Sequence, residues 1–197
     1  MGRIFTIIGK SATGKDHIYK ALLQDEALRL FPLVPYTTRP MRSGEKNGRE
    51  YVFVEKADLE RLRGEGRIIE ERVYETVHGP WHYFTADEGQ IDLDRGNYLA
   101  IGTLESYLLT SAYFGEGKVV PIYIETDDAT RLRRSVQREE KQTEPKYAEV
   151  CRRFLADEAD FSEDKLREAG IERRFSNNAD IADCIQEIRG YIKGKEE

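Results

Sequence analysis

The residues of this 197-residue sequence that first point to chemistry are two glycines, a lysine and an aspartate in one short segment, Gly9-Lys10-Ser11-Ala12-Thr13-Gly14-Lys15-Asp16. Phosphate oxygens need several N–H donors that converge on them, and glycine lets a loop backbone approach them closely. A lysine at position 15 would reach the outer phosphates as a mobile point charge. The spacing Gly-x4-Gly-Lys is that of a P-loop and predicts a phosphate-binding site.

The segments on both sides of this loop favour the same interpretation. Residues 4–8 form a β-branched apolar run typical of a buried strand. A helical pattern begins at about Asp16 and is expected to end at about Leu30, before two prolines. A loop that enters a helix N-terminus gains the positive end of the helix dipole. The alternative, a glycine turn in which Asp16 only caps the helix, is disfavoured because a strand and a helix lie on the correct sides.

Asp16 occupies the position at which a P-loop has Ser or Thr, whose hydroxyl binds Mg²⁺. A carboxylate is also a hard oxygen ligand for Mg²⁺. Its negative charge is favourable in the first turn of a helix. We therefore expect Asp16 to bind Mg²⁺ directly or through water.

Two arginines three residues apart, Arg39 and Arg42, precede a Gly-rich turn and an aromatic strand that begins at Tyr51. A phosphate dianion in a partly closed pocket needs forked donors, and two guanidinium groups can bind it bidentately while a tyrosine adds its hydroxyl. Either arginine alone would be a solvated loop residue. The pair, in a chain that also has a P-loop, predicts a second phosphate site.

The order of these motifs resembles the guanylate kinases. The segment Thr37-Thr38-Arg39-Pro40-Met41-Arg42, followed by Gly44-Glu45 and Gly48-Arg49-Glu50-Tyr51-Val52-Phe53-Val54, is similar to the nucleoside-monophosphate site of this family. The likeness runs from Ile4 to about Ile192. It implies a P-loop three-layer α/β/α fold in one domain, with a central parallel sheet. The implied parts are a core of about residues 1–34, 86–126 and 155–197, a small mixed α+β monophosphate-binding subdomain of about residues 35–85, and a helical lid of about residues 127–154.

The resemblance also implies roles for individual residues. ATP would bind Gly9, Lys10, Ser11, Ala12, Thr13, Gly14, Lys15 and Asp16, with Asn177 near the adenine. The monophosphate would bind Arg39, Arg42, Tyr51, Glu70, Tyr83 and Thr85, with Glu70 reading the guanine. Lys15, Arg39, Arg134, Arg138 and Arg153 would stabilise the phosphoryl group during its transfer. For the charged run that starts at Arg138, a solvated helix with i,i+4 pairs is an equally good interpretation.

Four positions depart from the pattern of this family. Ala100 and Gly102 stand where the family has carboxylates, one that helps to organise the metal and one that reads the guanine amino group. Pro35 is near the place of a serine that contacts guanine, and Phe84 replaces a glycine. Guanine specificity therefore stays open, and Glu105 is a candidate to replace the lost base contact.

The implied activity is that of an ATP-dependent guanylate kinase of purine nucleotide metabolism, which transfers the γ-phosphoryl group of ATP to GMP or dGMP with Mg²⁺. Two alternatives are a guanylate kinase-like binding module without catalysis and a related P-loop kinase for another monophosphate acceptor. The retained Gly9, Gly14 and Lys15 argue against the module. The acids missing at positions 100 and 102 favour the other acceptor.

The amino-acid composition limits the kinds of binding partner that we expect. Charged residues make up 35% of the chain, and the net charge of −6 leaves no overall basic excess for nucleic acid. No apolar run approaches membrane-spanning length, and only three residues precede the first expected strand, so we expect a cytoplasmic protein without a signal peptide. Cys151 and Cys184 lack metal-site spacing and read as packing or surface residues. The expected partners are nucleotides, not nucleic acid or membrane, in a monomer or homodimer.

The remaining apolar runs predict further elements. Strands are expected at residues 68–74, 81–85, 97–103, 119–126 and 172–178, and helices at residues 57–63, 144–159 and 179–192. The tail 193–197 is expected to be mobile.

Overall fold

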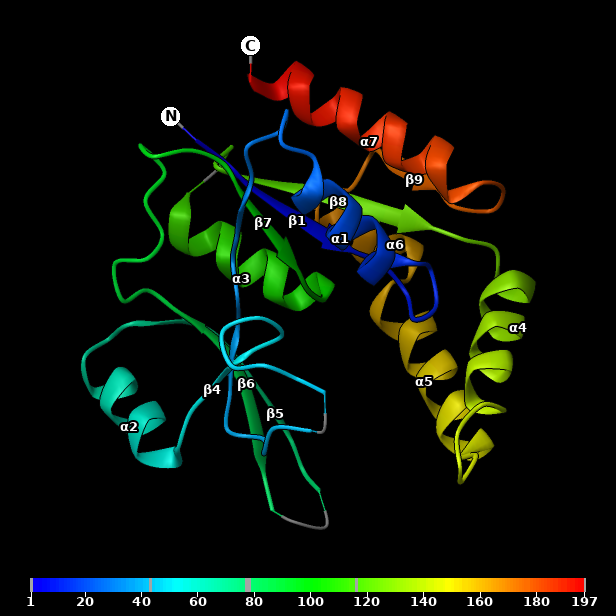
Figure 1. Cartoon of the computed structure of the whole chain (residues 1–197), viewed down its shortest axis with the longest axis horizontal. Helices are drawn as coiled ribbons and strands as arrows, with labels where there is room; N and C mark the ends of the chain where they lie inside the picture. The colour runs from blue at the N-terminus through cyan, green and yellow to red at the C-terminus, as the bar shows by residue number, and fades with distance from the viewer. Residues whose placement is uncertain (1, 43, 77–78, 116, 197) are drawn as a thin grey trace.

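The central element of the structure, a computed structural model that describes residues 2–42, 44–76, 79–115 and 117–196, is a five-stranded parallel sheet (Figure 1). Its strand order is β2-β7-β1-β8-β9, so the strand that leads into the P-loop lies in the middle. The strands are β1 (Ile4–Ile8), β2 (Phe31–Pro32), β7 (Tyr98–Ile101), β8 (Val119–Glu125) and β9 (Arg174–Ser176). All neighbours pair in parallel, and the sheet therefore presents the carboxyl ends of its strands at one edge.

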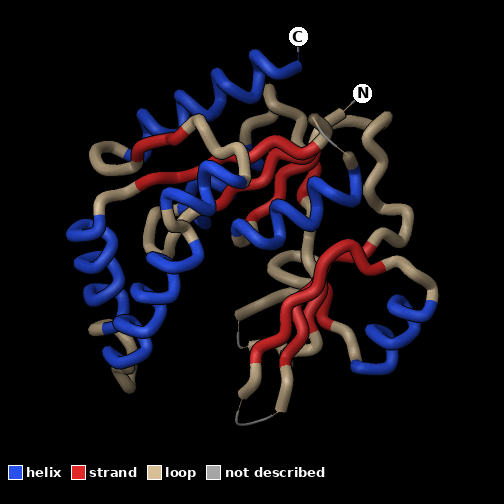
Figure 2. Tube along the Cα trace, turned by 180° about the vertical axis from the view of Figure 1, so that it is seen from behind, coloured by secondary structure: helices blue, strands red, loops and turns tan. Residues whose placement is uncertain are grey.

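Helices cover both faces of this sheet, as Figures 1 and 2 show. Phe5 and Ile7 of β1 pack in a buried cluster with residues of α1 (Lys15–Gln24) and α7 (Ile181–Glu196). Ile4 and Ile8 face the opposite way, because side chains alternate along a strand, and pack in a second cluster with α3 (Leu104–Phe114) and α6 (Glu163–Glu168). These three layers confirm the predicted α/β/α fold.

A second, four-stranded sheet lies apart from the first (Figure 2). Its order is β4 (Val52–Phe53), β3 (Tyr36–Thr37), β6 (Trp81–Ala86) and β5 (Ile68–Tyr74). Helix α2 (Lys56–Gly64) packs Leu59 and Leu62 against Phe84, which is fully buried. A large residue at position 84, where the family pattern has glycine, therefore fills the core of this small sheet.

Helices α4 (Asp128–Glu139) and α5 (Tyr147–Asp160) form a pair that projects from the carboxyl edge of the main sheet, on the same side as the second sheet (Figure 1). Among the described residues, no helix is both long enough and apolar enough to span a membrane. Cys151 is exposed, Cys184 is buried and both are free thiols, as expected.

Two expected boundaries were wrong. Helix α1 ends at Gln24, not Leu30, because the Asp25 carboxylate accepts a hydrogen bond from the backbone N–H of Ala27, which competes with the helical ladder. Arg29 then adopts a left-handed conformation and the chain enters β2. At the other end, α7 continues through Lys193 to Glu196 instead of forming a mobile tail; Glu197 lies outside the described residues.

Candidate active site

The loop between β1 and α1 has the backbone of a phosphate cradle. Gly9 and Gly14 adopt φ values of 148° and 91°, and neither site has room for a side chain. A Cβ at Gly9 would lie 2.5 Å from the carbonyl oxygen of Ile124, and one at Gly14 would lie 2.5 Å from Nδ2 of Asn177. Ala12 adopts a φ of 62°, which is uncommon for a residue with a side chain. The two glycines are therefore required by the shape of the loop.

Lys15 lies inside the curve of this loop. Its Nζ donates hydrogen bonds to the backbone oxygens of Gly9 (2.6 Å) and Lys10 (2.7 Å). Burial lowers the pKa of Lys15 to about 8, although the carboxylates of Asp157 and Asp16 oppose that shift. The ammonium group is thus positioned at the phosphate cradle, and its proton is more easily lost than that of an ordinary lysine.

Helix α5 holds the loop from outside through contacts that the sequence did not reveal. The Asp157 carboxylate accepts a hydrogen bond of 2.7 Å from the backbone N–H of Ser11, and Lys10 Nζ donates to Glu158 at 2.7 Å. Arg131 of α4, whose side chain is 1% exposed, binds Asp157 (3.3 Å) and Glu158 (2.6 Å). The lid helices are therefore tied to the P-loop by a charge network centred on the buried Arg131.

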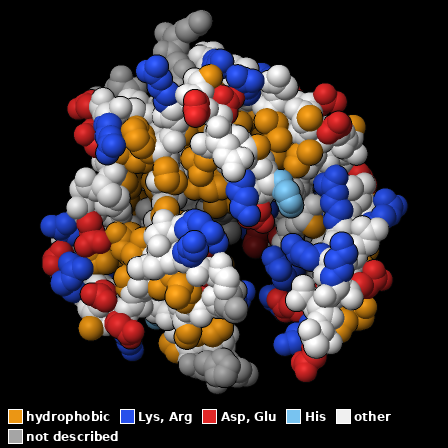
Figure 3. All heavy atoms as spheres, in the orientation of Figure 1, with side chains coloured by type: hydrophobic (Ala, Val, Ile, Leu, Met, Phe, Trp, Pro, Cys, Tyr) orange, Lys and Arg blue, Asp and Glu red, His pale blue; other side chains and the backbone are white. Residues whose placement is uncertain are grey.

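A cleft of ≈ 570 Å³ separates the P-loop from the second sheet. Figure 3 shows this hollow, with Lys and Arg side chains on both of its walls. Lys15 and Asp16 lie on the P-loop side, and Tyr51, Tyr83 and Arg72 lie on the opposite side. Two arginines of α5, Arg152 and Arg153, complete the lining. An anionic ligand in this cleft would meet positive charge from three directions.

Arg39 and Arg42 do not line this cleft, in contrast to the predicted pair of guanidinium groups that faces the P-loop. Arg39, whose side chain is 3% exposed, forms a forked ion pair with Glu45 at 2.8 and 3.1 Å. Its guanidinium carbon lies 5.6 Å from the ring centroid of Tyr51. Arg42 is exposed, and its backbone N–H also donates to Glu45. The carboxylate of Glu45 thus occupies the fork that we had assigned to phosphate.

The predicted lid arginines lie where the helices approach the loop. Arg153 Nη2 is 3.4 Å from the Ser11 hydroxyl oxygen, and Arg134 donates to the backbone oxygen of Asn177 at 3.2 Å. Arg138 lines both the cleft and a neighbouring pocket of ≈ 580 Å³, which also contains Asn177. Asn177 donates through Nδ2 to the backbone oxygen of Thr13, and its buried Oδ1 has no partner within the described ranges. The Asn177 amide is therefore fixed against the P-loop backbone and has one buried oxygen without a partner in the described part of the chain.

Glu70 and Thr85, both expected to bind the monophosphate, lie in contact with each other. The Glu70 side chain is 1% exposed, and its Oε1 accepts a hydrogen bond of 2.8 Å from the Thr85 hydroxyl. Arg72, which the sequence analysis overlooked, pairs with the same carboxylate. A signal for Arg72 was present, because alternation along a strand places residues 70 and 72 on one face.

Comparison with known proteins finds sequence similarity in the N-terminal part of the chain, which contains the P-loop and the second sheet. Residues 1–85 match the family model described as Guanylate kinase. A guanylate kinase of Cupriavidus metallidurans is 38% identical over 82 residues, which are 41% of this chain and 36% of that protein. One of Mycoplasma genitalium is 36% identical over 91 residues, which are 46% of this chain and 36% of that protein. Over this segment the chain is similar to the guanylate kinases.

Over its whole length the likeness to a guanylate kinase is one of fold. The crystal structure of guanylate kinase from Anaplasma phagocytophilum matches with a TM-score of 0.68 and 20% sequence identity, covering 98% of this chain and 86% of that chain. The sequence matches span only 36% of the length of the two curated relatives. The P-loop and Arg39 to Thr85 lie inside the matched family segment, whereas the lid arginines lie outside it.

The departures from the guanylate kinase pattern have structural explanations. At Gly102 a Cβ would lie 2.3 Å from the Ser106 hydroxyl oxygen, so a side chain at this position would require Ser106 to change its rotamer. Ala100 is buried in the cluster beside α3. Together with Glu70 and Thr85, they line a narrow cavity of ≈ 20 Å³.

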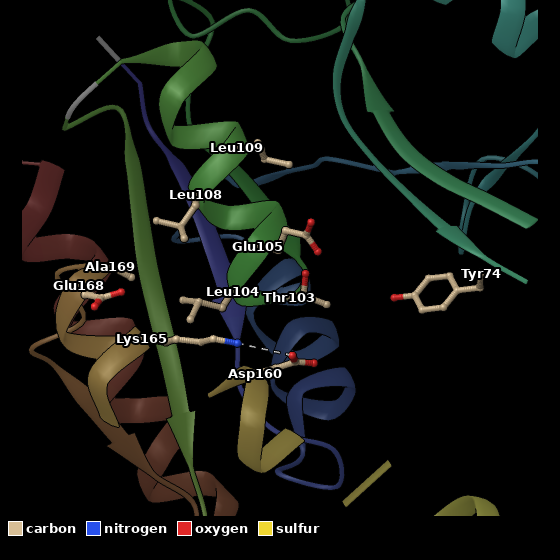
Figure 4. Close-up of a pocket in the computed structure, with 10 residues that line it drawn as sticks. All are labelled: Tyr74, Thr103, Leu104, Glu105, Leu108, Leu109, Asp160, Lys165, Glu168 and Ala169. Carbon is tan, nitrogen blue, oxygen red and sulfur yellow. Dashed lines mark ion pairs between the residues drawn. The ribbon is translucent and has the colours of Figure 1, made fainter. Parts of the chain in front are cut away.

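Glu105 was the wrong candidate for a replacement base contact. It lines a separate pocket of ≈ 520 Å³ with Leu104 and Leu108 of α3 and with Lys165 (Figure 4). Glu105 belongs to the first turn of α3 and does not line the cavity around Glu70. The position of Glu105 in the first turn of α3 therefore places it in a different pocket from Glu70.

Proposed function

We propose that the chain is an ATP-dependent nucleoside monophosphate kinase with GMP or dGMP as acceptor, giving ADP and the nucleoside diphosphate. The observation that carries this proposal is the cleft with the P-loop on one wall and Tyr51 and Tyr83 on the other. Both walls belong to the segment that matches the guanylate kinase family model. Two phosphate sites that face each other are what phosphoryl transfer between two nucleotides requires.

In this proposal the P-loop amides and Lys15 hold the phosphates of ATP. An oxygen of the acceptor phosphate attacks the γ-phosphorus, and the bond from that phosphorus to the bridging oxygen of ADP breaks. Arg138 and Arg153 neutralise the charge that collects on the transferred group, since both line the cleft. The residues of the chain supply position and charge, not a covalent intermediate.

The acceptor phosphate would contact Tyr51 and Tyr83 first, with Arg39 behind the Tyr51 ring. The ion pair with Glu45 fixes the Arg39 guanidinium, because a forked contact leaves it little freedom. A phosphate dianion carries more negative charge than the Glu45 carboxylate and would compete with it for the N–H donors of the Arg39 guanidinium. Arg42 follows three residues later in the same irregular loop and is exposed.

The residues beside the P-loop fit Mg²⁺, which commonly binds one or two carboxylates together with substrate phosphates. Within the described residues there is no cluster of three or more His, Cys, Asp or Glu side chains that could hold a metal alone. Asp16 is exposed and lines the cleft next to Lys15, whereas Asp157 is already bound to Ser11 and Arg131. Asp16 is therefore the residue that would hold the ion, and a bound Mg²⁺ would neutralise phosphate charge.

We also propose that residues 35–85 and 127–154 act as a monophosphate-binding subdomain and a lid that close on a core of residues 1–34, 86–126 and 155–197. The support is the separate second sheet and the projecting α4–α5 pair on either side of the cleft. Closure would exclude water that could otherwise hydrolyse ATP.

An ADP-release assay with ATP and Mg²⁺ tests the proposal, with GMP, dGMP, AMP, UMP, CMP and phosphorylated sugars as acceptors. We expect turnover with GMP and dGMP, and a loss of at least about 100-fold in kcat for Lys15→Ala. Lys20→Ala on the exposed side of α1 is the matched control and should retain full activity. Absence of turnover with every acceptor would refute the proposal and favour a non-catalytic binding module.

A further inference from the structure

The acceptor side of the cleft contains a buried ion pair that alters what Glu70 can bind. Arg72 Nε lies 3.1 Å from Glu70 Oε2, and Arg72 Nη2 lies 3.4 Å from Glu70 Oε1. The Thr85 hydroxyl donates to Oε1 at 2.8 Å. A carboxylate offers about four lone-pair sites. Three of these are occupied, so Glu70 has room for one further donor, at Oε2.

Arg72 has hydrogen-bonding capacity left for a ligand. A guanidinium carries five N–H groups, and the contacts to Glu70 use two of them. Within the described residues, no other hydrogen bond to this guanidinium is seen. Arg72 lines both the wide cleft and the narrow cavity around Glu70, and its charge acts on the Tyr51 hydroxyl. It therefore stands at the junction between the phosphate site and the base site.

The narrow cavity behind the ion pair is too small for a base. Its volume of ≈ 20 Å³ is about that needed for one water molecule. Thr6 also lines it, and the buried Thr6 hydroxyl oxygen has no partner among the described residues, which a water there would satisfy. A base must therefore stay in the wide cleft, which Arg72 lines, and only its edge can reach the Glu70 carboxylate behind Arg72.

Among the described residues, no second carboxylate lines this cavity. Ala100, Gly102 and Pro35 have no polar side chain. The Ser106 hydroxyl is engaged with the backbone of Thr103. The pocket therefore offers one carboxylate acceptor site on Glu70 next to donors on Arg72, and no second carboxylate for a further amino group.

Resting on the proposed function, we propose that this site accepts 6-oxopurine nucleoside monophosphates as a class, GMP and IMP alike, and that Arg72 selects the 6-oxo group. The N1–H of the base donates to Glu70 Oε2, and its O6 accepts from the Arg72 guanidinium. The 2-amino group, which distinguishes guanine from hypoxanthine, has no dedicated partner. With the phosphate end fixed in the cleft, adenine would present an amino group to Arg72 and an unprotonated N1 to Glu70, which is unfavourable at both contacts.

The test is a comparison of kcat/KM for GMP, IMP and AMP with the full-length chain, ATP and Mg²⁺, together with the Kd of each acceptor by calorimetry. We expect GMP and IMP to agree within about tenfold, since one unassigned hydrogen bond separates them. AMP should be at least about thirtyfold poorer than GMP, because two buried groups stay unsatisfied. The Kd values should follow the same order without any need for turnover.

The variant Arg72→Ala isolates the selecting residue. We expect kcat/KM to fall about 10- to 100-fold for GMP and IMP and to stay the same or rise for AMP. Arg67→Ala is the matched control, because Arg67 is a half-exposed arginine beside the same strand that pairs with Glu65 at 3.0 Å. It should leave all three values unchanged. Arg72→Ala leaves the buried Glu70 carboxylate without its cation, which could destabilise the fold. The Kd of the variant for ATP therefore serves as a check of folding. The GMP-to-IMP and GMP-to-AMP ratios of the wild-type chain test the base preference independently of this variant.

The outcomes separate the two claims. A GMP preference over IMP well above tenfold, with GMP active, would overturn the 6-oxopurine class and leave the kinase in place. An unchanged GMP-to-AMP ratio in folded Arg72→Ala would overturn the role of Arg72. No turnover with any nucleotide would refute the kinase itself, and the Kd values would then decide the base preference alone.

Discussion

Asp157 of α5 and Ser11 of the P-loop, separated by 146 positions in the chain, are joined by a hydrogen bond of 2.7 Å from the Ser11 N–H to the carboxylate. A P-loop amide that would serve a phosphate oxygen is thus satisfied by an anion of the protein itself. Arg131 holds that carboxylate from the side of α4. Phosphate and Asp157 therefore compete for the same part of the loop.

Removal of the Asp157 charge should strengthen ATP binding. For Asp157→Asn we expect the Kd of ATP to fall by about tenfold, because a negative charge near the phosphates disappears. Titration calorimetry at fixed ionic strength measures this. Asp164→Asn, an exposed acid on α6, is the control and should change nothing. Weaker binding by Asp157→Asn would mean that this residue positions the nucleotide.

Arg131 should be important for stability because its buried guanidinium neutralises Asp157 and Glu158. Arg131→Ala removes the cation that pairs with both carboxylates, and we expect a loss of about 2–3 kcal/mol in the free energy of unfolding. Urea denaturation measures the loss. Arg133→Ala lies on the exposed face of the same helix and should cost less than about 0.5 kcal/mol. Equal effects of the two substitutions would argue against the network.

The pKa of Lys15 makes nucleotide binding depend on pH. Below about pH 8 the ammonium is already charged in the free protein, so the affinity for ATP should be flat. Above pH 8 the free protein loses this proton while bound phosphate favours its retention, so the affinity should fall by up to tenfold per pH unit. Kd measurements between pH 7 and 9.5 test this. Lys15→Ala should remove the slope, and a flat wild-type profile would contradict the burial effect.

Asp16 is expected to act through the metal. Asp16→Asn should reduce Mg²⁺-dependent turnover by at least about 100-fold, since an amide oxygen carries no charge for the ion. Asp16→Ser restores the residue type of a common P-loop and should recover part of the rate. The rate as a function of Mg²⁺ concentration is the measurement. Unchanged kinetics for Asp16→Asn would show that Asp16 does not hold the ion.

Features that reside in one short segment were predictable from the sequence. The P-loop needs its glycines at fixed spacing, and both indeed have positive φ and no space for a Cβ. Strand β5 coincides with the predicted residues 68–74, because its apolar and polar residues end at clear turn signals. Glu70 and Thr85 were assigned to one site by the family resemblance, and the two side chains lie in contact in the structure.

Features that depend on competition between distant groups were not predictable. Arg39 was expected to face the cleft, but its guanidinium pairs with the carboxylate of Glu45. Arg131 looked like one of several arginines on a charged helix, and only the packing of α4 against α5 buries it. Composition and spacing do not reveal which charged residue of a helix becomes enclosed.

Ala12 adds a consequence for how quickly the loop can respond to ATP. A left-handed backbone at a residue with a Cβ is held against its own preference at a cost of about 1–3 kcal/mol. The folded protein already has this strained conformation before ATP binds. Binding of the phosphates therefore requires no change in the backbone dihedral angles of Ala12. Ligand capture at the loop is then limited by departure of the Asp157 side chain and not by reshaping of the main chain.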